Sequence, residues 1–249
     1  MAGHSHWAGI KHRKAAADKK RGKIFSKLAK AIISAARTGG GDPTTNLGLR
    51  YALDKARAAN MPRDTIARAI KKGTGELEGD QIQELTYEGY GPGGAALLIQ
   101  AITDNPNRTA PDVRHLIEKR GGRLGKPGCV AWNFEKKTLI TIRTDAVDED
   151  ALIEAALDAG ADDVTNEGAS FAVTGPPGAF GALAQALRQL DLTLDTCDIT
   201  YLPKSRVMLS PEDARKLIAI IEGLEDHDDV QSAITNGDIP DAVLAELGA

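Results

Sequence analysis

The sequence predicts an α+β protein with an N-terminal three-helix domain followed by two ferredoxin-like α+β domains, one inserted in the other. Three observations support this fold class. Apolar residues recur at helical spacing in the first third of the chain, strand-like and helix-like segments alternate beyond it, and one helix and one strand are left over near the C-terminus. The expected domains are residues 1–78, residues 79–135 together with 203–240, and an inserted βαββαβ domain at 136–202.

The first helix is expected over residues 24–37. Its apolar residues recur at steps of three and four, so they share one face. Basic residues lie on the opposite side and form a cationic ridge: Lys20, Lys23, Lys27, Lys30 and Arg37. The segment 38–43 contains three glycines and a proline, which end the helix.

Two further helices complete the expected bundle. The second runs from about Asn46 to Ala59. The third begins at Pro62, a residue suited to the first position of a helix, and stops at Gly73. Residues 73–80 have the glycine and acid content of a linker.

Strand and helix patterns alternate through the middle of the chain. A ββαβ segment is expected from strands 84–90 and 95–103, helix 109–120 and a strand at 129–134. A βαββαβ segment follows, with strands 138–143, 163–166, 170–174 and 193–202 and helices 148–159 and 178–190. That order is the signature of the split βαβ, ferredoxin-like unit.

The last expected elements are a helix at 211–222 and a strand at 229–235. They are too few to fold alone, and the ββαβ segment lacks a second helix to cover its sheet. Joining the two pieces makes the middle domain discontinuous. Between this helix and strand, Glu225–Asp229 contains residue types that bind metals, but a solvated polar turn explains the segment adequately.

The formal net charge of −4 conceals a strong segregation of charge. Residues 1–72 contain 17 Lys and Arg against 4 Asp and Glu, a balance of +13, whereas the rest has 14 against 31, a balance of −17. An ordinary solvated surface intersperses the two signs. The segregation therefore predicts that one end of the chain holds an anionic partner, for which a nucleic acid is the leading candidate.

Several other classes of protein are disfavoured. No apolar run approaches the roughly 18 residues of a membrane span, and the N-terminus lacks an apolar core before a small-residue cleavage site, so a cytoplasmic protein is expected. An organellar transit peptide is the alternative for the basic N-terminus. Cys129 and Cys197 form neither a disulfide framework nor a zinc motif. Catalytic and nucleotide-cradling signatures are lacking, so we expect neither an enzyme nor a cofactor.

Nucleic-acid binding is assigned to the basic N-terminal region. His4, His6 and His12 suggest a metal site, but the neighbouring positive charges favour phosphate contact. Trp7 is suited either to stacking on a base or to sealing the helical bundle. The complete candidate set is His4, His6, Trp7, Lys11, His12, Arg13, Lys14, Lys19, Lys20, Arg21, Lys23, Lys27, Lys30, Arg63 and Arg68.

The second and third helices also invite a helix-turn-helix interpretation, with residues 62–72 in a major groove. The third helix has no Asn or Gln to read adenine, which leaves Arg63, Thr65 and Arg68 as possible base readers. Recognition of phosphates or of shape is therefore favoured over a sequence code.

Several motifs in order resemble the YebC/PmpR family over nearly the whole chain. They are Met1–Trp7, Lys11–Ala16, Lys20–Phe25, Tyr87–Gly94, Asp104-Asn105, Asn107–Thr109, Gly121-Gly122 and Leu124-Gly125. The resemblance implies a three-domain protein, usually described as a DNA-binding transcriptional regulator, although some relatives are associated with ribosomes and translation. His6 departs from the family pattern, where lysine is usual.

Two hypotheses follow. The first is a DNA-binding transcriptional regulator whose acidic domains meet protein partners or a second copy. The alternative is a ribosome-associated translation factor that binds ribosomal RNA through the same basic region. Its partner contacts are expected at Tyr90, Gly91, Pro92, Gly93, Gly94, Asn107 and Arg108.

Overall fold

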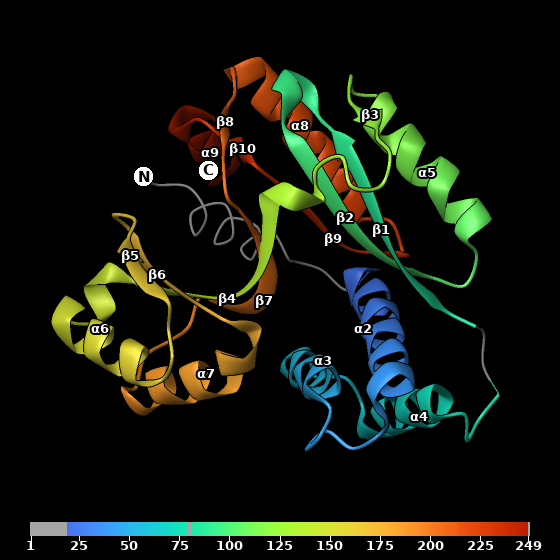
Figure 1. The fold of residues 1–249 in the computed structure, drawn as a ribbon, viewed down its shortest axis with the longest axis horizontal. Coiled ribbons are helices and arrows are strands. Elements are labelled where there is room, and N and C mark those ends of the chain that lie inside the picture. The colour runs from blue at the N-terminus through green and yellow to red at the C-terminus, as the bar shows by residue number, and fades with distance from the viewer. Residues whose placement is uncertain (1–18, 79–80, 249) are drawn as a thin grey trace. The chain divides into compact units, whose positions relative to one another are not determined.

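A computed structural model describes residues 19–78 and 81–248 (Figure 1). Their contacts define two compact units. One contains the described residues up to 131 together with 215–235, and the other contains 132–214 and 236–248. The α+β class predicted from the sequence is confirmed, with a helical region first and antiparallel sheets after it. None of the helices in the described ranges is long and apolar enough to cross a membrane.

Three helices open the first unit: α2 (Lys19–Gly39), α3 (Leu47–Ala58) and α4 (Arg63–Thr74). Their small core includes the fully buried residues Ile32, Leu49 and Ala56. Asn46 fixes the turn between α2 and α3, because its side chain accepts the Leu49 N–H at 3.0 Å and donates to the carbonyl oxygens of Ala35 and Gly40, each at 2.8 Å.

Gly73 does not act as the helix stop expected from the sequence. It lies inside α4 and is buried, and a Cβ atom there would approach the Ala36 Cβ and the Ile33 carbonyl oxygen to 2.6 Å. The helix ends one residue later, at Thr74, where Gly75 adopts a left-handed φ of 83°. The predicted linker therefore begins two residues too early, and Gly73 permits close packing of α4 on α2.

The same unit contains a four-stranded antiparallel sheet in the order β3-β1-β2-β9. The strands are β1 (Gln83–Tyr90), β2 (Ala96–Thr103), β3 (Arg123–Leu124) and β9 (Val230–Thr235). Helices α5 (Pro106–Glu118) and α8 (Pro211–Glu225) run beside these strands (Figure 1). Strand β9 pairs with β2, so a segment more than a hundred residues away along the chain completes the sheet.

The prediction of a strand at residues 129–134 is wrong. Residues 131–133 form a short 3₁₀ helix (Ala131–Asn133), and the strand that joins this sheet is β3, nearer to α5. The Glu88 carboxylate accounts for the loop, because it accepts the backbone N–H groups of Gly128, Val130 and Ala131 at 2.6–2.8 Å. These backbone groups bind a buried side chain and are not available to a strand.

The second unit is built on a sheet in the order β5-β6-β4-β7, from β4 (Phe134–Arg143), β5 (Asp163–Asn166), β6 (Ser170–Gly175) and β7 (Thr196–Pro203). Helices α6 (Glu149–Asp158) and α7 (Phe180–Gln189) connect the strands. In each βαβ connection one other strand lies between the two that the helix joins, which is the split arrangement predicted from the sequence. Leu152, Leu183 and Ile140 are fully buried in its core.

Three elements near the C-terminus were not predicted. The two-residue strands β8 (Val207–Met208) and β10 (Gly237–Asp238) pair in parallel, and α9 (Asp241–Gly248) follows with Val243 and Leu244 buried. Strands of two residues are too short to show a hydrophobic period. The domain boundaries at 78, 135, 202 and 240 remain a prediction.

Candidate functional site

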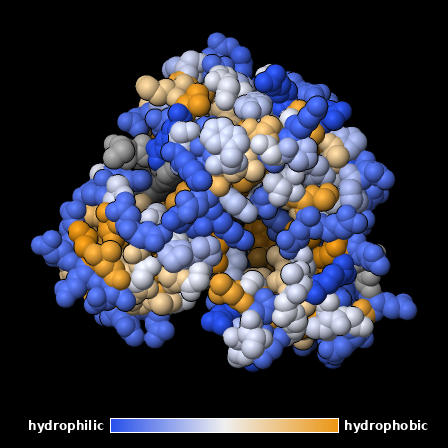
Figure 2. Space-filling model, viewed as in Figure 1, coloured by the Kyte–Doolittle hydropathy of each residue, from blue (hydrophilic) through white to orange (hydrophobic). Residues whose placement is uncertain are grey.

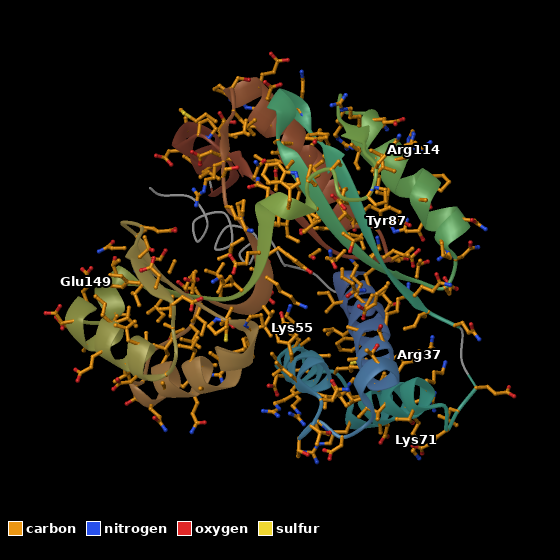
Figure 3. The ribbon with its side chains drawn as sticks, in the orientation of Figure 1. Arg37, Lys55, Lys71, Tyr87, Arg114 and Glu149 are labelled. Carbon is orange, nitrogen blue, oxygen red and sulfur yellow. The ribbon has the colours of Figure 1, made fainter. Side chains whose placement is uncertain are left out.

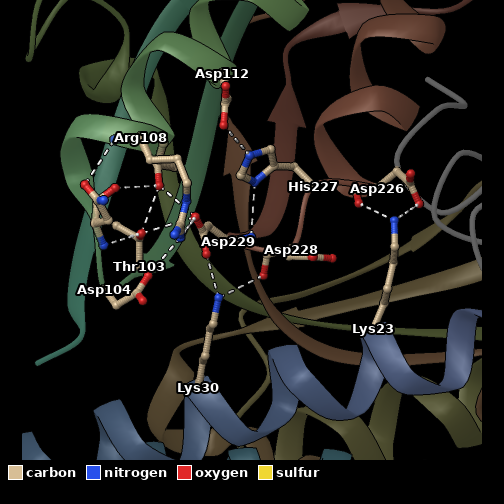
Figure 4. Close-up of polar contacts among 12 residues, drawn as sticks. Lys23, Lys30, Thr103, Asp104, Arg108, Asp112, Asp226, His227, Asp228 and Asp229 are labelled. Atoms are coloured by element: carbon tan, nitrogen blue, oxygen red, sulfur yellow. Dashed lines mark hydrogen bonds and ion pairs between the residues drawn. The ribbon is translucent and has the colours of Figure 1, made fainter. Parts of the chain in front are cut away.

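The strongest concentration of charged contacts in the first unit joins α2 to the loop that follows α8. We call residues 225–229 the acidic loop, since four of the five are Asp or Glu, and we call Lys23, Lys27 and Lys30 the lysine row. The spacing of four and three residues places these lysines on one face of α2. All three ammonium groups point toward the acidic loop; Figure 4 draws those of Lys23 and Lys30.

Each lysine binds oxygen atoms of the acidic loop. Lys23 Nζ lies 3.0 Å from Asp226 Oδ1 and 3.1 Å from the Asp226 carbonyl oxygen. Lys27 donates to the Glu225 carbonyl oxygen at 2.5 Å, and Lys30 Nζ lies 2.5 Å from Asp229 Oδ1. The ridge predicted as a phosphate-binding surface is therefore occupied by acceptors from the same chain.

The contact continues along the same face of α2 toward its C-terminus. Ser34 Oγ donates to Glu84 Oε1 at 2.5 Å, and Arg37 Nη1 donates to the Ile82 carbonyl oxygen at 2.9 Å. The predicted cationic ridge thus docks the helical region onto the β1 end of the sheet as well as onto the acidic loop.

Asp229 is the centre of this network, and only 2% of its side chain is exposed. Besides Lys30, its carboxylate accepts from Arg108 Nη2 at 2.8 Å, Thr109 Oγ1 at 2.7 Å and Thr103 Oγ1 at 3.2 Å (Figure 4). Its carbonyl oxygen also accepts the Ile102 N–H at 2.8 Å. Four donors from α2, β2 and α5 therefore satisfy one buried carboxylate.

The electrostatics follow from these contacts. Burial alone would raise the pKa of Asp229, but hydrogen bonds from Arg108, Lys30 and Thr109 outweigh it and hold that pKa well below the usual range. The same carboxylate, with Asp104, raises the pKa of Arg108. Burial lowers the pKa of Lys27, although the neighbouring acids oppose the shift.

A cavity of about 690 Å³ adjoins the network. Lys23, Lys30 and Lys72 line it from the helical region, and Arg108, Asp112 and His227 from the other side. His227 Nδ1 accepts the Asp229 N–H at 3.1 Å, and its Nε2 lies 3.4 Å from Asp112 Oδ2. The described ranges contain no cluster of three His, Cys, Asp or Glu placed to hold a metal ion.

Helix α4 presents a second basic surface, and this one faces solvent. Ala69 and Gly73 are buried against the other helices, whereas Arg63, Arg68 and Lys71 are exposed (Figure 3 labels Lys71). We call these three residues the α4 basic face. Figure 2 shows that hydrophilic side chains dominate the face it draws, with hydrophobic ones in small separate groups.

The expected partner-contact residues are not all brought together. Tyr90–Gly94 lie where β1 turns into β2, whereas Asn107 and Arg108 follow the other end of β2, eight residues along the strand. Tyr90 donates to the Cys129 carbonyl oxygen at 3.1 Å, and the Arg123 guanidinium lies 5.0 Å from the centre of its ring. Gly93 and Gly94 are exposed, and Arg108 binds Asp229 and Asp104.

Several predicted residues cannot be placed at this site. His4, His6, Trp7, Lys11, His12, Arg13 and Lys14 lie outside the described residues. Lys19, Lys20 and Arg21 form the first turn of α2, but the positions of their side chains are not described.

Sequence reasoning missed two features of the charge distribution. The sequence predicts a polar turn at the acidic loop, with metal binding as the alternative, although its four acids in five residues complement the charge of the three-residue lysine row. In addition, residues 106–126 contain six of the 14 Lys and Arg found beyond residue 72, against two acids. Arg114, Lys119, Arg123 and Lys126 are exposed there. A local count of charge would have revealed both features.

The fold and these surfaces define the class as a protein of helical and α+β domains, in which one basic helix contacts an acidic loop and another faces solvent. The N-terminal domain of TACO1/YebC proteins matches residues 5–76, and the second and third TACO1/YebC domains match residues 82–237. The chain therefore belongs to the TACO1/YebC family, as the sequence motifs predicted.

Relatives and a solved structure agree with this assignment. A protein of Acidithiobacillus ferrooxidans is 51% identical over 249 residues, which cover 100% of this chain and 99% of the relative. One from Dictyoglomus turgidum is 50% identical over 99% of this chain and 100% of the relative. Both are named probable transcriptional regulatory proteins. The crystal structure of a conserved hypothetical protein from Aquifex aeolicus matches with a TM-score of 0.82 and 45% identity, covering 94% of this chain and 97% of that one.

Proposed function

We propose that this protein is a non-enzymatic, cytoplasmic regulator of gene expression that binds DNA through its basic helical region. The observation that supports this most directly is the α4 basic face. Its three cationic side chains are exposed on the side of α4 opposite the buried Ala69 and Gly73. Such a surface displaces condensed counterions from a phosphate backbone and needs no cofactor. The names of the relatives as transcriptional regulatory proteins agree with this role.

Contact with phosphates is favoured over reading of bases. The residues of α4 include no Asn or Gln, the side chains that pair with adenine in a major groove. Arginine and lysine on a helix surface bind phosphate oxygens whatever the sequence. Specificity is then expected to come from the shape of the nucleic acid or from a protein partner of the acidic domains.

The test replaces the α4 basic face with acids, in Arg63→Glu with Arg68→Glu and Lys71→Glu. Binding to duplex DNA is measured by fluorescence anisotropy between about 50 and 200 mM salt. We expect weaker binding and a salt slope reduced by about 0.9 for each phosphate that the variant no longer binds. The matched control, Arg143→Glu with Arg188→Glu and Lys204→Glu, changes the net charge equally in the other unit. Equal binding by the two triple variants would refute the assignment.

The lack of Asn and Gln on α4 also favours a second candidate, a ribosome-associated translation factor that binds ribosomal RNA. Structured RNA is recognised largely through its backbone and shape. Sedimentation of a lysate separates the two functions. A translation factor should move with ribosomes and leave them after RNase treatment, whereas a transcriptional regulator should protect promoter DNA in a footprint.

A further inference from the structure

We infer that the lysine row of α2 is a second phosphate-binding surface and that the chain's own acidic loop covers it in the described state. Nucleic acid would reach these lysines only after the loop leaves them. This inference rests on the proposed function, because it assigns a regulated part of the same nucleic-acid surface.

The chemistry of the contact resembles that of a phosphate backbone. The three ammonium groups are met by carboxylate and carbonyl oxygens, all of them hydrogen-bond acceptors like phosphate oxygens. From Lys23 to Lys30 the helix rises about 10 Å, a span over which one strand of a duplex carries about three charges. The acidic loop offers four carboxylates within five residues. The carboxylates of Asp226 and Asp229 contact lysines directly, and those of Glu225 and Asp228 add negative charge around Lys27.

The acidic loop can separate from the lysines and retain its own contacts. If Lys30 is displaced, the buried Asp229 carboxylate still accepts hydrogen bonds from Arg108, Thr103 and Thr109. At the other end, the side chains of Asp226 and Lys23 are 70% and 44% exposed. Ion pairs that exposed contribute little and are screened by salt. A polyanion can therefore compete for the lysines one at a time.

The experiment neutralises the releasable acids and leaves the buried one alone, in Asp226→Asn with Asp228→Asn. The matched control is Glu154→Gln with Asp158→Asn, two exposed acids of α6 in the other unit, which changes the net charge equally. Affinity for duplex DNA and for structured RNA is measured by anisotropy at several salt concentrations. Thermal unfolding is used to check that both double variants are folded.

We expect the loop variant to bind roughly two- to fivefold more tightly than the control, because the exposed Lys23–Asp226 ion pair is lost and the negative charge of Asp228 near Lys27 is removed. Its salt slope should also be steeper, by about one for each lysine released to a phosphate. If the acidic loop serves only to hold α2 in place, the loop variant should show no gain in affinity for nucleic acid and no steeper salt slope.

A second set of variants assigns the gain to the lysine row. Lys23→Gln with Lys30→Gln should weaken binding more in the loop variant than in the unchanged protein, because fewer acids of the loop compete for the lysines there. If the unchanged protein binds nucleic acid and the loop variant gains nothing over its control, this inference fails while the proposed function stands. If no variant binds nucleic acid even at low salt, both fail.

Discussion

At the residue scale, Asp229 shows how one side chain joins three segments of the first unit. It is buried and accepts hydrogen bonds from α2, β2 and α5. Asp229→Asn keeps the shape but removes the charge that Lys30 and Arg108 face. We expect the free energy of unfolding to fall by about 3–5 kcal/mol, as for other broken buried pairs, measured by chemical denaturation. The exposed Asp158→Asn should change it by less than about 0.5 kcal/mol.

The same carboxyl group predicts a dependence of stability on pH. Its folded pKa is depressed below the ordinary value of about 3.9, so its stabilising contribution is present above about pH 4 and is lost as the pH falls. The difference in unfolding free energy between the unchanged protein and Asp229→Asn should therefore be largest near neutral pH and shrink in acid. A difference that grows on acidification would contradict the assignment of this network.

Glu88 makes a second residue-scale prediction. Burial would raise its pKa, but three backbone N–H donors outweigh burial and lower it. In Glu88→Gln one carboxylate oxygen is replaced by an amide NH₂ group. This group cannot accept a hydrogen bond, and it lies against backbone N–H donors of the loop. We expect a loss of about 1–3 kcal/mol in unfolding free energy. Glu118→Gln, an exposed change of the same type on α5, serves as the control and should be close to neutral.

At the scale of elements, replacing glycine by alanine is expected to have opposite effects at Gly22 in α2 and Gly73 in α4. Alanine is favoured over glycine by up to about 1 kcal/mol inside a helix. Gly22→Ala in α2 meets no atom within 4 Å and should raise the melting temperature. Gly73→Ala in α4 brings a Cβ to 2.6 Å from Ala36 and Ile33, so it should lower the melting temperature by separating the helices. A stabilised Gly73→Ala would show that α4 does not pack this closely on α2.

Elements were predictable wherever their pattern was long enough to repeat. The helices α2 to α8 and the strands of the second sheet lie close to their predicted positions, because burial on one face imposes a period on the residues. The pattern failed at residues 129–134, a nearly continuous apolar run that resembles a buried strand. There the buried Glu88 carboxylate binds the backbone N–H groups, and a partner 40 or more residues away cannot be read from local periodicity.

At the scale of the whole molecule, β9 and α8 predict how truncation affects each sheet. β2 pairs with β9, whereas the sheet β5-β6-β4-β7 is formed by the continuous segment 134–203. A chain ending at residue 210 should lose amide protection in β1 and β2 but keep it in β4 and β6, as measured by hydrogen exchange. The full-length chain is the reference, and protection retained in β2 would show that the first sheet does not need its C-terminal strand.

The sequence by itself determined the α+β class, the order of the main elements, the family and the segregation of charge. Each of these features follows from periodicity, motif order or composition, and none of those three depends on contacts between distant residues. Only the tertiary structure decided which charges face solvent. Lys23, Lys27 and Lys30 meet the acidic loop, while Arg63, Arg68 and Lys71 are exposed. The reason is that an ion pair forms between residues some 200 positions apart only when the fold places them together, and charge counted along a chain carries no such information.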